Sequence, residues 1–215
     1  MTALVLGLRG VAAILVLTTL VGGIPRVVQA ALALTLGLWS GLLLAPTHPL
    51  DASIVVAINE LAIGASLGVL GAVPLLAASA AGRLVDIAAT GKAQGPYSTF
   101  FGILAAAVFV GIDGHVAVIT AIVDSHDSTR TILAAEPRVL AAIAQLVPVA
   151  IRLAVPWLVT AAVVQIAVGV GMRLAARAGV HAPAAAAVPA ALVMMTASLV
   201  ALLAIAMAAV MRGAL

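Results

Sequence analysis

The sequence predicts an all-α, polytopic membrane protein of about six hydrophobic helices, some of them broken and arranged as hairpins, within a single domain over residues 1–215. Hydrophobic residues make up 65% of the chain and charged residues 8%, and the mean hydropathy is +1.33. About one quarter of a typical soluble domain is charged. The apolar runs are separated by short links that hold most of the charge, which is the pattern of helices crossing a bilayer.

Composition also limits the chemistry of the chain. It contains no cysteine, which excludes disulfides, thiolate nucleophiles and cysteine metal sites. The net charge of +3 is spread over several links, which suits membrane interfaces better than a nucleic-acid surface. We see no pairing of a nucleophile with a base, so we expect neither an enzyme nor a bound cofactor. The apolar start continues directly into a second apolar run, so we expect it to be retained and not cleaved as a signal peptide.

Two helices form the predicted N-terminal hairpin. The first lies between Arg9 and Arg26 and is marginal in length, because about 20 apolar residues are needed to cross a bilayer. Pro25 and Arg26 follow two glycines and mark the turn. The second helix begins after Arg26 and ends near Pro46 or Pro49.

An acidic link and a third helix follow. The link covers residues 51–60 and ends at Glu60, and the apolar run from Leu61 to Ala81 predicts the helix. Gly64 and Gly68 have the spacing that lets the backbone of a neighbouring helix approach closely. The alternative is loose use of small residues in an alanine-rich chain.

A loop over residues 83–95 and a fourth helix from about Ser98 to Ile112 come next. Three of the six aromatic residues gather at the start of this helix, namely Tyr97, Phe100 and Phe101. They could form a hydrophobic gasket at a constriction. The alternative is an aromatic anchor at the membrane interface. The loop lacks the glycine and hydroxyl spacing of a nucleotide-binding P-loop.

The region after the fourth helix is polar and broken. Gly114 and His115 precede a short apolar run over residues 116–123, which we expect to be a half-helix or an in-plane segment. We expect Gly114 and His115 to form a tight turn in which the imidazole is bonded to a carbonyl. A polar loop over residues 124–138 begins at Asp124. A solvated loop is favoured over a metal site for its acidic and histidine side chains.

The next apolar run contains an arginine. Pro148, Arg152 and Pro156 interrupt residues 139–171, so this run predicts either two pieces or one kinked helix. An arginine near mid-membrane costs about 2.5–3.5 kcal/mol on insertion scales, so we expect Arg152 to face protein or water. Arg152 and Glu60 are candidate members of ion pairs that fix helix packing, and a proton relay is the alternative.

A basic link over residues 173–177 leads to a final helix that ends near Met211. The distribution of lysine and arginine predicts a topology in which basic links lie on the cytoplasmic side. The basic links are at Arg26, 83–92 and 173–177, and the acidic links outside are 51–60 and 113–127.

Several short motifs stand in a characteristic order along the chain. They are Ile24-Pro25-Arg26 and Leu44-Ala45-Pro46 in the first hairpin, Glu60 to Gly64 with Gly68 in the third helix, Phe101 to Leu104, Gly114-His115, and Ile122 to Asp124. In this order they resemble the type III export-gate family, which includes FliR of the flagellar export apparatus and SctT of the virulence injectisome. The resemblance covers nearly the whole chain.

The resemblance implies a structural subunit of a protein secretion pore in the bacterial inner membrane. In that family one copy joins several copies of FliP or SctR and of FliQ or SctS, and FlhB or SctU wraps around the cytoplasmic side. Unfolded secreted proteins pass through this gate, much of which sits above the bilayer plane in that family, and membrane lipid is a further expected partner. The candidate pore or gate residues are Tyr97, Phe100 and Phe101, and the candidate structural or subunit-contact residues are Arg9, Pro25, Arg26, Glu60, Gly64, Gly68, Gly114, His115, Asp124 and Arg152.

The chain departs from the family pattern in two places. The segment between Gly82 and Gly114 is shorter than in typical FliR and lacks the aromatic loop that ends in Asp-Pro. An alanine-rich stretch over residues 181–188 replaces a pattern that contains phenylalanine. A small-molecule secondary transporter is the alternative function, indicated by the broken runs at 116–123 and 148–156.

Overall fold

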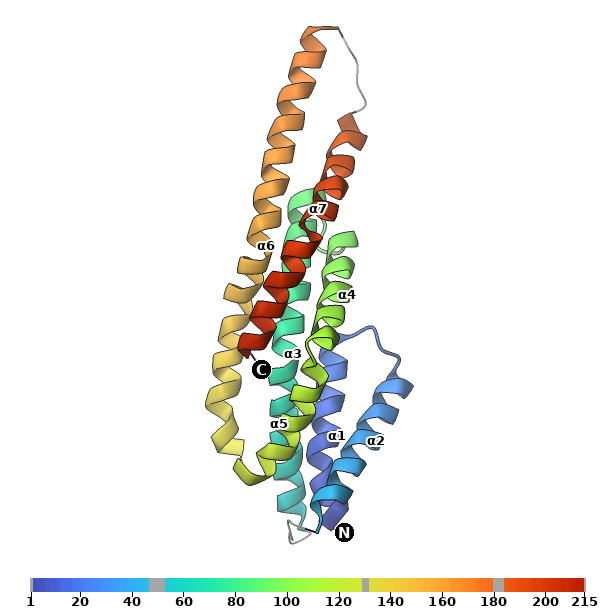
Figure 1. The fold of residues 1–215 in the computed structure, drawn as a ribbon, viewed down its shortest axis with the longest axis vertical. Coiled ribbons are helices and arrows are strands. Elements are labelled where there is room, and N and C mark those ends of the chain that lie inside the picture. Colours follow the sequence, from blue (N-terminus) through green and yellow to red (C-terminus); the bar gives the residue numbers. More distant parts are fainter. Residues whose placement is uncertain (1, 47–52, 129–131, 180–183, 215) are drawn as a thin grey trace. The chain divides into compact units, whose positions relative to one another are not determined.

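The computed structural model describes residues 2–46, 53–128, 132–179 and 184–214, and all regular elements within these ranges are helices. Figure 1 shows their order along the chain. The helices are α1 (Thr2–Val21), α2 (Arg26–Leu44), α3 (Ile54–Thr90), α4 (Pro96–Gly111), α5 (Gly114–Ser128), α6 (Ile132–Arg177) and α7 (Ala184–Ala214). The predicted all-α architecture is confirmed.

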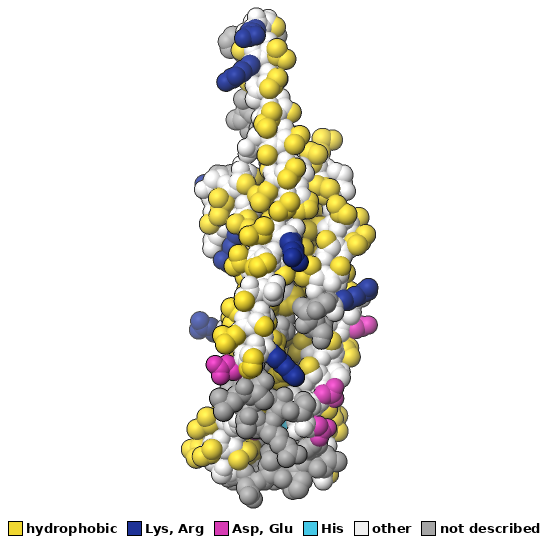
Figure 2. Space-filling view, turned by 90° about the vertical axis from the view of Figure 1, so that its left-hand side faces the viewer, with side chains coloured by type: hydrophobic (Ala, Val, Ile, Leu, Met, Phe, Trp, Pro, Cys, Tyr) yellow, Lys and Arg dark blue, Asp and Glu magenta, His cyan; other side chains and the backbone are white. Residues whose placement is uncertain are grey.

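Five helices in the described ranges are long and apolar enough to cross a membrane. A sixth span results if α4 and α5 are counted as one broken span, which fits the predicted number of about six. Figure 2 shows hydrophobic side chains spread over the face in view, with a few basic side chains among them. Such a surface is suited to lipid or to apolar partner proteins, and the chain is a multi-pass helical membrane protein.

The chain divides into two compact units, which are described separately. Unit 1 comprises Met1–Leu76, Phe109–Val147 and Met211–Leu215, and unit 2 comprises Ala77–Val108 and Pro148–Val210. In unit 1, α1 packs along α2 and also contacts α5. Each unit contains one of the two side-chain clusters described below.

The first helix is longer than predicted and contains Arg9 in its interior. α1 begins at Thr2 and has 20 residues, whereas the sequence placed Arg9 in front of a marginal helix. That boundary was wrong because a paired arginine can lie within an apolar helix. The backbones of α1 and α2 approach each other closely, since a Cβ added at Gly7 of α1 would lie 2.9 Å from the carbonyl oxygen of Gly37 in α2. Glycines at this contact therefore permit the tight hairpin.

The third helix includes two segments that were predicted to lie outside helices. α3 begins at Ile54, so Glu60 belongs to the helix and not to an acidic link. It also continues to Thr90 through most of the predicted loop, because apolar residues persist between the few charges there. Gly91, with φ of 72°, follows the last residue of α3 and supplies the left-handed conformation that commonly ends helices. Residues 51–52 of the predicted link lie outside the described ranges.

The fourth predicted helix corresponds to α4, but the predicted polar loop over residues 124–138 was wrong at both ends: α5 includes residues 124–128, and α6 begins at Ile132. Residues 129–131 lie outside the described ranges. α5 includes both the short apolar run and the start of the predicted loop, as far as Ser128. The turn between α4 and α5 is made by Asp113, whose φ is 58°, and not by Gly114. Aspartate tolerates this left-handed conformation better than most residues do. His115 lies exposed in the first turn of α5.

The long apolar run near the C-terminus is one helix. α6 continues through Pro148, Arg152 and Pro156, so the two-piece alternative is wrong. Membrane helices tolerate proline because local adjustments and neighbouring groups satisfy the freed carbonyl. α6 also contains residues 173–177, which were predicted as a link, and α7 contains the predicted final helix.

Candidate functional site

A buried ion pair joins α1 to α3 in unit 1. Arg9 Nε donates to Glu60 Oε2 at 2.7 Å, and Arg9 Nη2 donates to Glu60 Oε1 at 2.8 Å. Arg9 is 2% exposed and Glu60 is 4% exposed. A guanidinium that meets a carboxylate through two parallel hydrogen bonds is held in a defined orientation. This pair therefore fixes the two helices in one register.

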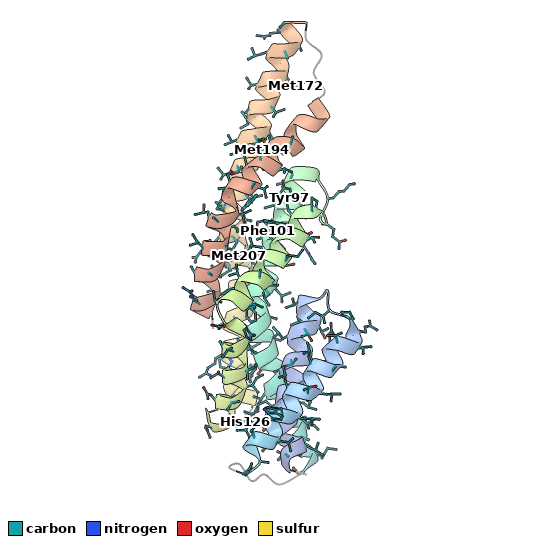
Figure 3. All side chains as sticks on the ribbon, turned by 45° about the vertical axis from the view of Figure 1, so that its right-hand side comes forward. Tyr97, Phe101, His126, Met172, Met194 and Met207 are labelled. Carbon is teal, nitrogen blue, oxygen red and sulfur yellow. The ribbon has the colours of Figure 1, made fainter. Side chains whose placement is uncertain are left out.

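Side chains of α5 complete the cluster around the ion pair. Arg9 Nη1 donates to Ser125 Oγ at 2.8 Å, and Ser125 Oγ lies 2.6 Å from the carbonyl oxygen of Ile122. The Nδ1 atom of His126 is 3.0 Å from the same carbonyl oxygen, and its Nε2 atom is 3.8 Å from Glu60 Oε2. His126 is labelled on α5 in Figure 3. We call Arg9, Glu60, Ser125 and His126 the polar cluster.

Two glycines of α3 allow α1 to approach the polar cluster. A Cβ added at Gly64 would overlap the carbonyl oxygen of Arg9, and one at Gly68 would overlap that of Ala13. Any side chain at these positions would force the helix backbones apart. The backbone contact and the ion pair thus occur at the same place on α1.

The two residues predicted as candidate members of ion pairs differ in the structure. Glu60 belongs to an ion pair, but its partner is Arg9, which the sequence placed at a helix end. Arg152 is exposed on α6, and no ion pair joins it to a residue that the structure describes. The imidazole bonded to a carbonyl is that of His126, whereas the prediction assigned this role to His115. Sequence reasoning missed Ser125 as a partner of Arg9, because the two residues lie 116 positions apart.

The turn between α1 and α2 contains the predicted Pro25-Arg26 motif. Pro25 has φ of −58° and ψ of 139° and precedes α2, and Arg26 is exposed at the first position of that helix. Gln29, which the sequence analysis did not single out, closes the turn. Its Nε2 atom donates to the carbonyl oxygen of Ile24 at 3.0 Å, and its Oε1 atom accepts from Thr19 Oγ1 at 3.3 Å.

The predicted aromatic residues lie in unit 2, where they surround Trp157 of α6. Ring centroids are 6.2 Å from Trp157 for Tyr97, 6.5 Å for Phe100 and 5.6 Å for Phe101. Figure 3 labels Tyr97 and Phe101 on α4. Phe101 and Tyr97 are buried, so these rings pack within the chain. Trp157 was missed because it stands alone in the sequence. We call these four residues the aromatic cluster.

A second buried carboxylate supports the aromatic cluster. Asp86 of α3 is fully buried and accepts hydrogen bonds from the backbone N–H groups of Tyr97 at 3.0 Å and Ser98 at 2.7 Å. A carboxylate at the start of a helix satisfies amides that lack helical partners and interacts favourably with the helix dipole. On the same face of α3, Gly82 lies against Tyr97, Ser98 and Phe101. These contacts set where α4 begins.

The remaining predicted residues lie on α5. Gly114 is packed against the ring of Phe109, so a side chain there would collide with it. Asp124 and His115 are exposed on α5. Within the described ranges, no three His, Asp or Glu side chains are grouped as a metal site would require.

The polar cluster contains ionisable groups, but its geometry is that of a helix clamp. It joins three helices through short hydrogen bonds, and no nucleophile paired with a base is found at this cluster in the described part of the chain. Searches of curated proteins and of solved structures gave no match. A family model described as "Bacterial export proteins, family 1" matches residues 1–214. The chain, a helical membrane protein that matches this model along nearly all its length, therefore belongs to the bacterial export protein family 1, the family of FliR and SctT.

Proposed function

We propose that the chain is a structural, non-enzymatic subunit of the export gate of a type III protein secretion system in the bacterial inner membrane. The family match over residues 1–214 carries this proposal, because it covers the hairpin, the polar cluster and the aromatic cluster together. The order of the motifs Ile24-Pro25-Arg26, Gly114-His115 and Ile122 to Asp124 supports the type III assignment. The substrates would be unfolded secreted proteins.

The proposed partners are FliP- or SctR-like and FliQ- or SctS-like gate subunits and a FlhB- or SctU-like protein. Large apolar side chains on several helices support such an assembly, since Val27 is 81% exposed, Met194 77% and Ile205 68%. In a membrane, sister subunits can cover part of such a surface through close helix packing, and lipid covers the rest. Arg26, at the first position of α2, and Arg152, within α6, are both exposed and are proposed contact residues.

The two clusters have proposed structural roles within the gate. The polar cluster would keep α1, α3 and α5 in a fixed arrangement while a polypeptide passes through the assembly. The packing of Phe101 and Tyr97 against Trp157 favours an anchoring role for the aromatic cluster over a freely moving gasket. A direct pore-closing role for Tyr97 and Phe100 stays a prediction.

A clean gene deletion in the encoding bacterium tests the proposed function. Secretion of the system's substrates should be abolished, and a plasmid copy of the gene should restore it, whereas the ATPase activity upstream of the gate should persist. Two small hydrophobic proteins should also purify with the tagged chain in detergent. Normal secretion by the deletion strain would refute the proposal.

A small-molecule transporter remains the second candidate because α4 and α5 are bent by 64° at a short break, as in a broken span or a re-entrant loop. Discontinuous helices of this kind form many transporter sites. The other observation behind it is lost, since α6 is unbroken at residues 148–156. Reconstitution of the purified chain alone separates the two functions. A gate subunit should move no solute by itself, whereas saturable solute uptake into proteoliposomes would favour the transporter.

A further inference from the structure

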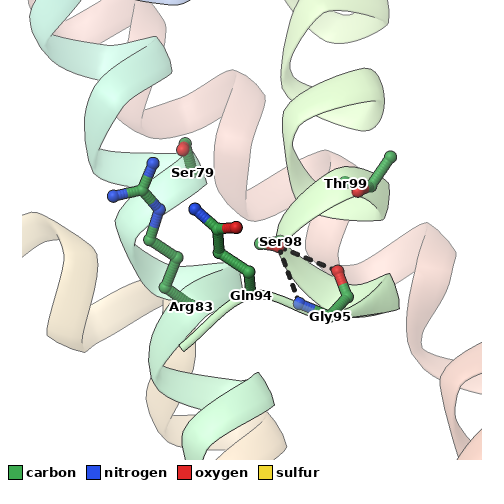
Figure 4. Close-up of a pocket in the computed structure, with 6 residues that line it drawn as sticks. All are labelled: Ser79, Arg83, Gln94, Gly95, Ser98 and Thr99. Atoms are coloured by element: carbon green, nitrogen blue, oxygen red, sulfur yellow. Dashed lines mark hydrogen bonds between the residues drawn. The ribbon is translucent and has the colours of Figure 1, made fainter. Parts of the chain in front are cut away.

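A polar pocket lies in unit 2 beside the start of α4. Its volume is about 420 Å³. Figure 4 shows the guanidinium of Arg83 from α3 beside the side chains of Ser79 and Gln94. No acidic side chain is among the residues that line the pocket, which are Ser79, Arg83, Gln94, Gly95, Ser98 and Thr99. The lining thus offers one fixed positive charge together with amide and hydroxyl groups.

The nearby acidic residue, Asp86, lies behind Gly95 but does not line the pocket. Asp86 is fully buried, and its carboxylate accepts the backbone N–H groups of Tyr97 and Ser98. These amides of α4 are therefore already used, and any anion in the pocket must be bound by side chains. Arg83 is exposed, and no ion pair joins it to another residue in the described part of the chain. A guanidinium presents five N–H donors in a planar fork.

We propose that this pocket binds the phosphate group of an anionic phospholipid. Arginine recognises phosphate through paired, charge-assisted hydrogen bonds, and Gln94 and Thr99 can donate to the remaining oxygens. Arg83 lies towards the end of the apolar stretch of α3, which is long enough to cross a membrane. Basic pockets at such helix ends bind lipid headgroups. The aromatic cluster in the same unit contains Tyr97 and Trp157, residue types that concentrate at the level of the headgroups.

Native mass spectrometry of the purified full-length chain with added phosphatidylglycerol tests this proposal. The Arg83→Gln variant should bind the lipid about tenfold more weakly, because hydrogen bonds to a charged group are lost. Arg177→Gln is the matched control, since Arg177 is an exposed arginine in the last turn of α6 and lies outside the pocket. It should bind like the wild type. Thr99→Val, which removes one hydroxyl from the rim, should weaken binding less than Arg83→Gln does.

Two further ligands identify the source of the phosphate. Phosphatidylcholine, whose headgroup is neutral overall, should bind more weakly than phosphatidylglycerol, and inorganic phosphate at millimolar concentration should not displace the bound lipid. Equal lipid binding by wild type and Arg83→Gln would overturn the proposal, as would displacement by inorganic phosphate alone. Unchanged circular dichroism of each variant establishes that it is folded. Lipid binding is measured without secretion, so the outcome is independent of the proposed function.

Discussion

Glu60 and Asp86 are two buried carboxylates on the same helix, one in each compact unit, and they are satisfied in different ways. Glu60 meets the guanidinium of Arg9, which lies 51 residues away along the chain. Asp86 meets two backbone N–H groups only 11 and 12 residues away. The first carboxylate is hydrogen-bonded to a remote side chain, whereas the second accepts backbone N–H groups, which nearly every residue type supplies.

This difference determines how each region tolerates mutation. Removing one member of a buried ion pair leaves the other charge without compensation in a medium of low polarity, which is strongly destabilising. A carboxylate bound by backbone amides keeps its partners when the neighbouring side chains change. Unit 1 should therefore be sensitive at a few specific side chains, and unit 2 should be sensitive mainly to the loss of Asp86 itself or of ring packing.

The largest effect is expected for Arg9→Leu. It leaves Glu60 buried without its partner and should lower the free energy of unfolding by about 3–5 kcal/mol. Denaturation of the purified protein in mixed micelles measures the change. The double variant Arg9→Leu/Glu60→Leu should recover much of the loss, because no buried charge remains. Arg152→Leu, at an exposed arginine, is the control, and a similar loss there would contradict the comparison.

A smaller effect is expected where α1 and α3 come together beside the ion pair. Gly64→Ala places a methyl group against the carbonyl oxygen of Arg9 and should cost about 1–3 kcal/mol through displacement of the backbone. Gly102→Ala is the matched control, because a Cβ there meets nothing within 4 Å. This variant should be neutral or stabilising, since alanine has a higher helix propensity than glycine. If thermal unfolding in detergent gave the same shift for both variants, close approach at Gly64 would not matter.

Loss of the carboxylate in unit 2 should cost less than loss of Arg9. Asp86→Ala removes the acceptor of two backbone N–H groups at the start of α4 and should destabilise by about 1–2 kcal/mol, as the loss of a helix cap does. Asp86→Asn keeps one acceptor oxygen and should fall between the alanine variant and the wild type. The midpoint of chemical unfolding reports both values. A larger loss for Asp86→Ala than for Arg9→Leu would reverse the comparison.

The smallest effect is expected in the aromatic cluster. Phe101→Leu retains an apolar side chain but removes the edge contact with Trp157, and should cost about 1 kcal/mol. In a Trp39→Phe background Trp157 is the sole tryptophan, so its fluorescence reports this site directly. Its emission should shift in Phe101→Leu and stay unchanged in Ile103→Leu, where the side chain is 66% exposed. An unaltered spectrum in Phe101→Leu would argue against the ring contact.

Features that depend on local sequence could be predicted. Hydropathy alone indicated the helical membrane class, and the prolines and glycines near Pro25 placed the turn between α1 and α2. The start of α4 was predicted at about Ser98, within two residues of its observed position at Pro96. The close packing at Gly64 and Gly68 was predicted as one of two alternatives, since the spacing of small residues is visible in the sequence.

Features that depend on distant partners could not be predicted. Arg9 looked like a helix boundary because an isolated charge is unfavourable in an apolar helix, and its distant partners Glu60 and Ser125 make its interior position acceptable. Likewise, Asp86 lies in the predicted loop by sequence, and its burial in α3 is compensated by backbone N–H groups of α4 that the sequence did not connect to it. Trp157 has no aromatic neighbour in sequence, so nothing connected it to the cluster at Phe101 before the fold was known.

The positive φ of Asp113 restricts which amino acids can be accommodated at the break between α4 and α5. Valine, isoleucine and threonine are strongly disfavoured at a left-handed position, whereas glycine and asparagine are compatible with it. A saturation library at residue 113, selected for secretion, should therefore be enriched in glycine, asparagine and aspartate and depleted of residues that branch at the β-carbon.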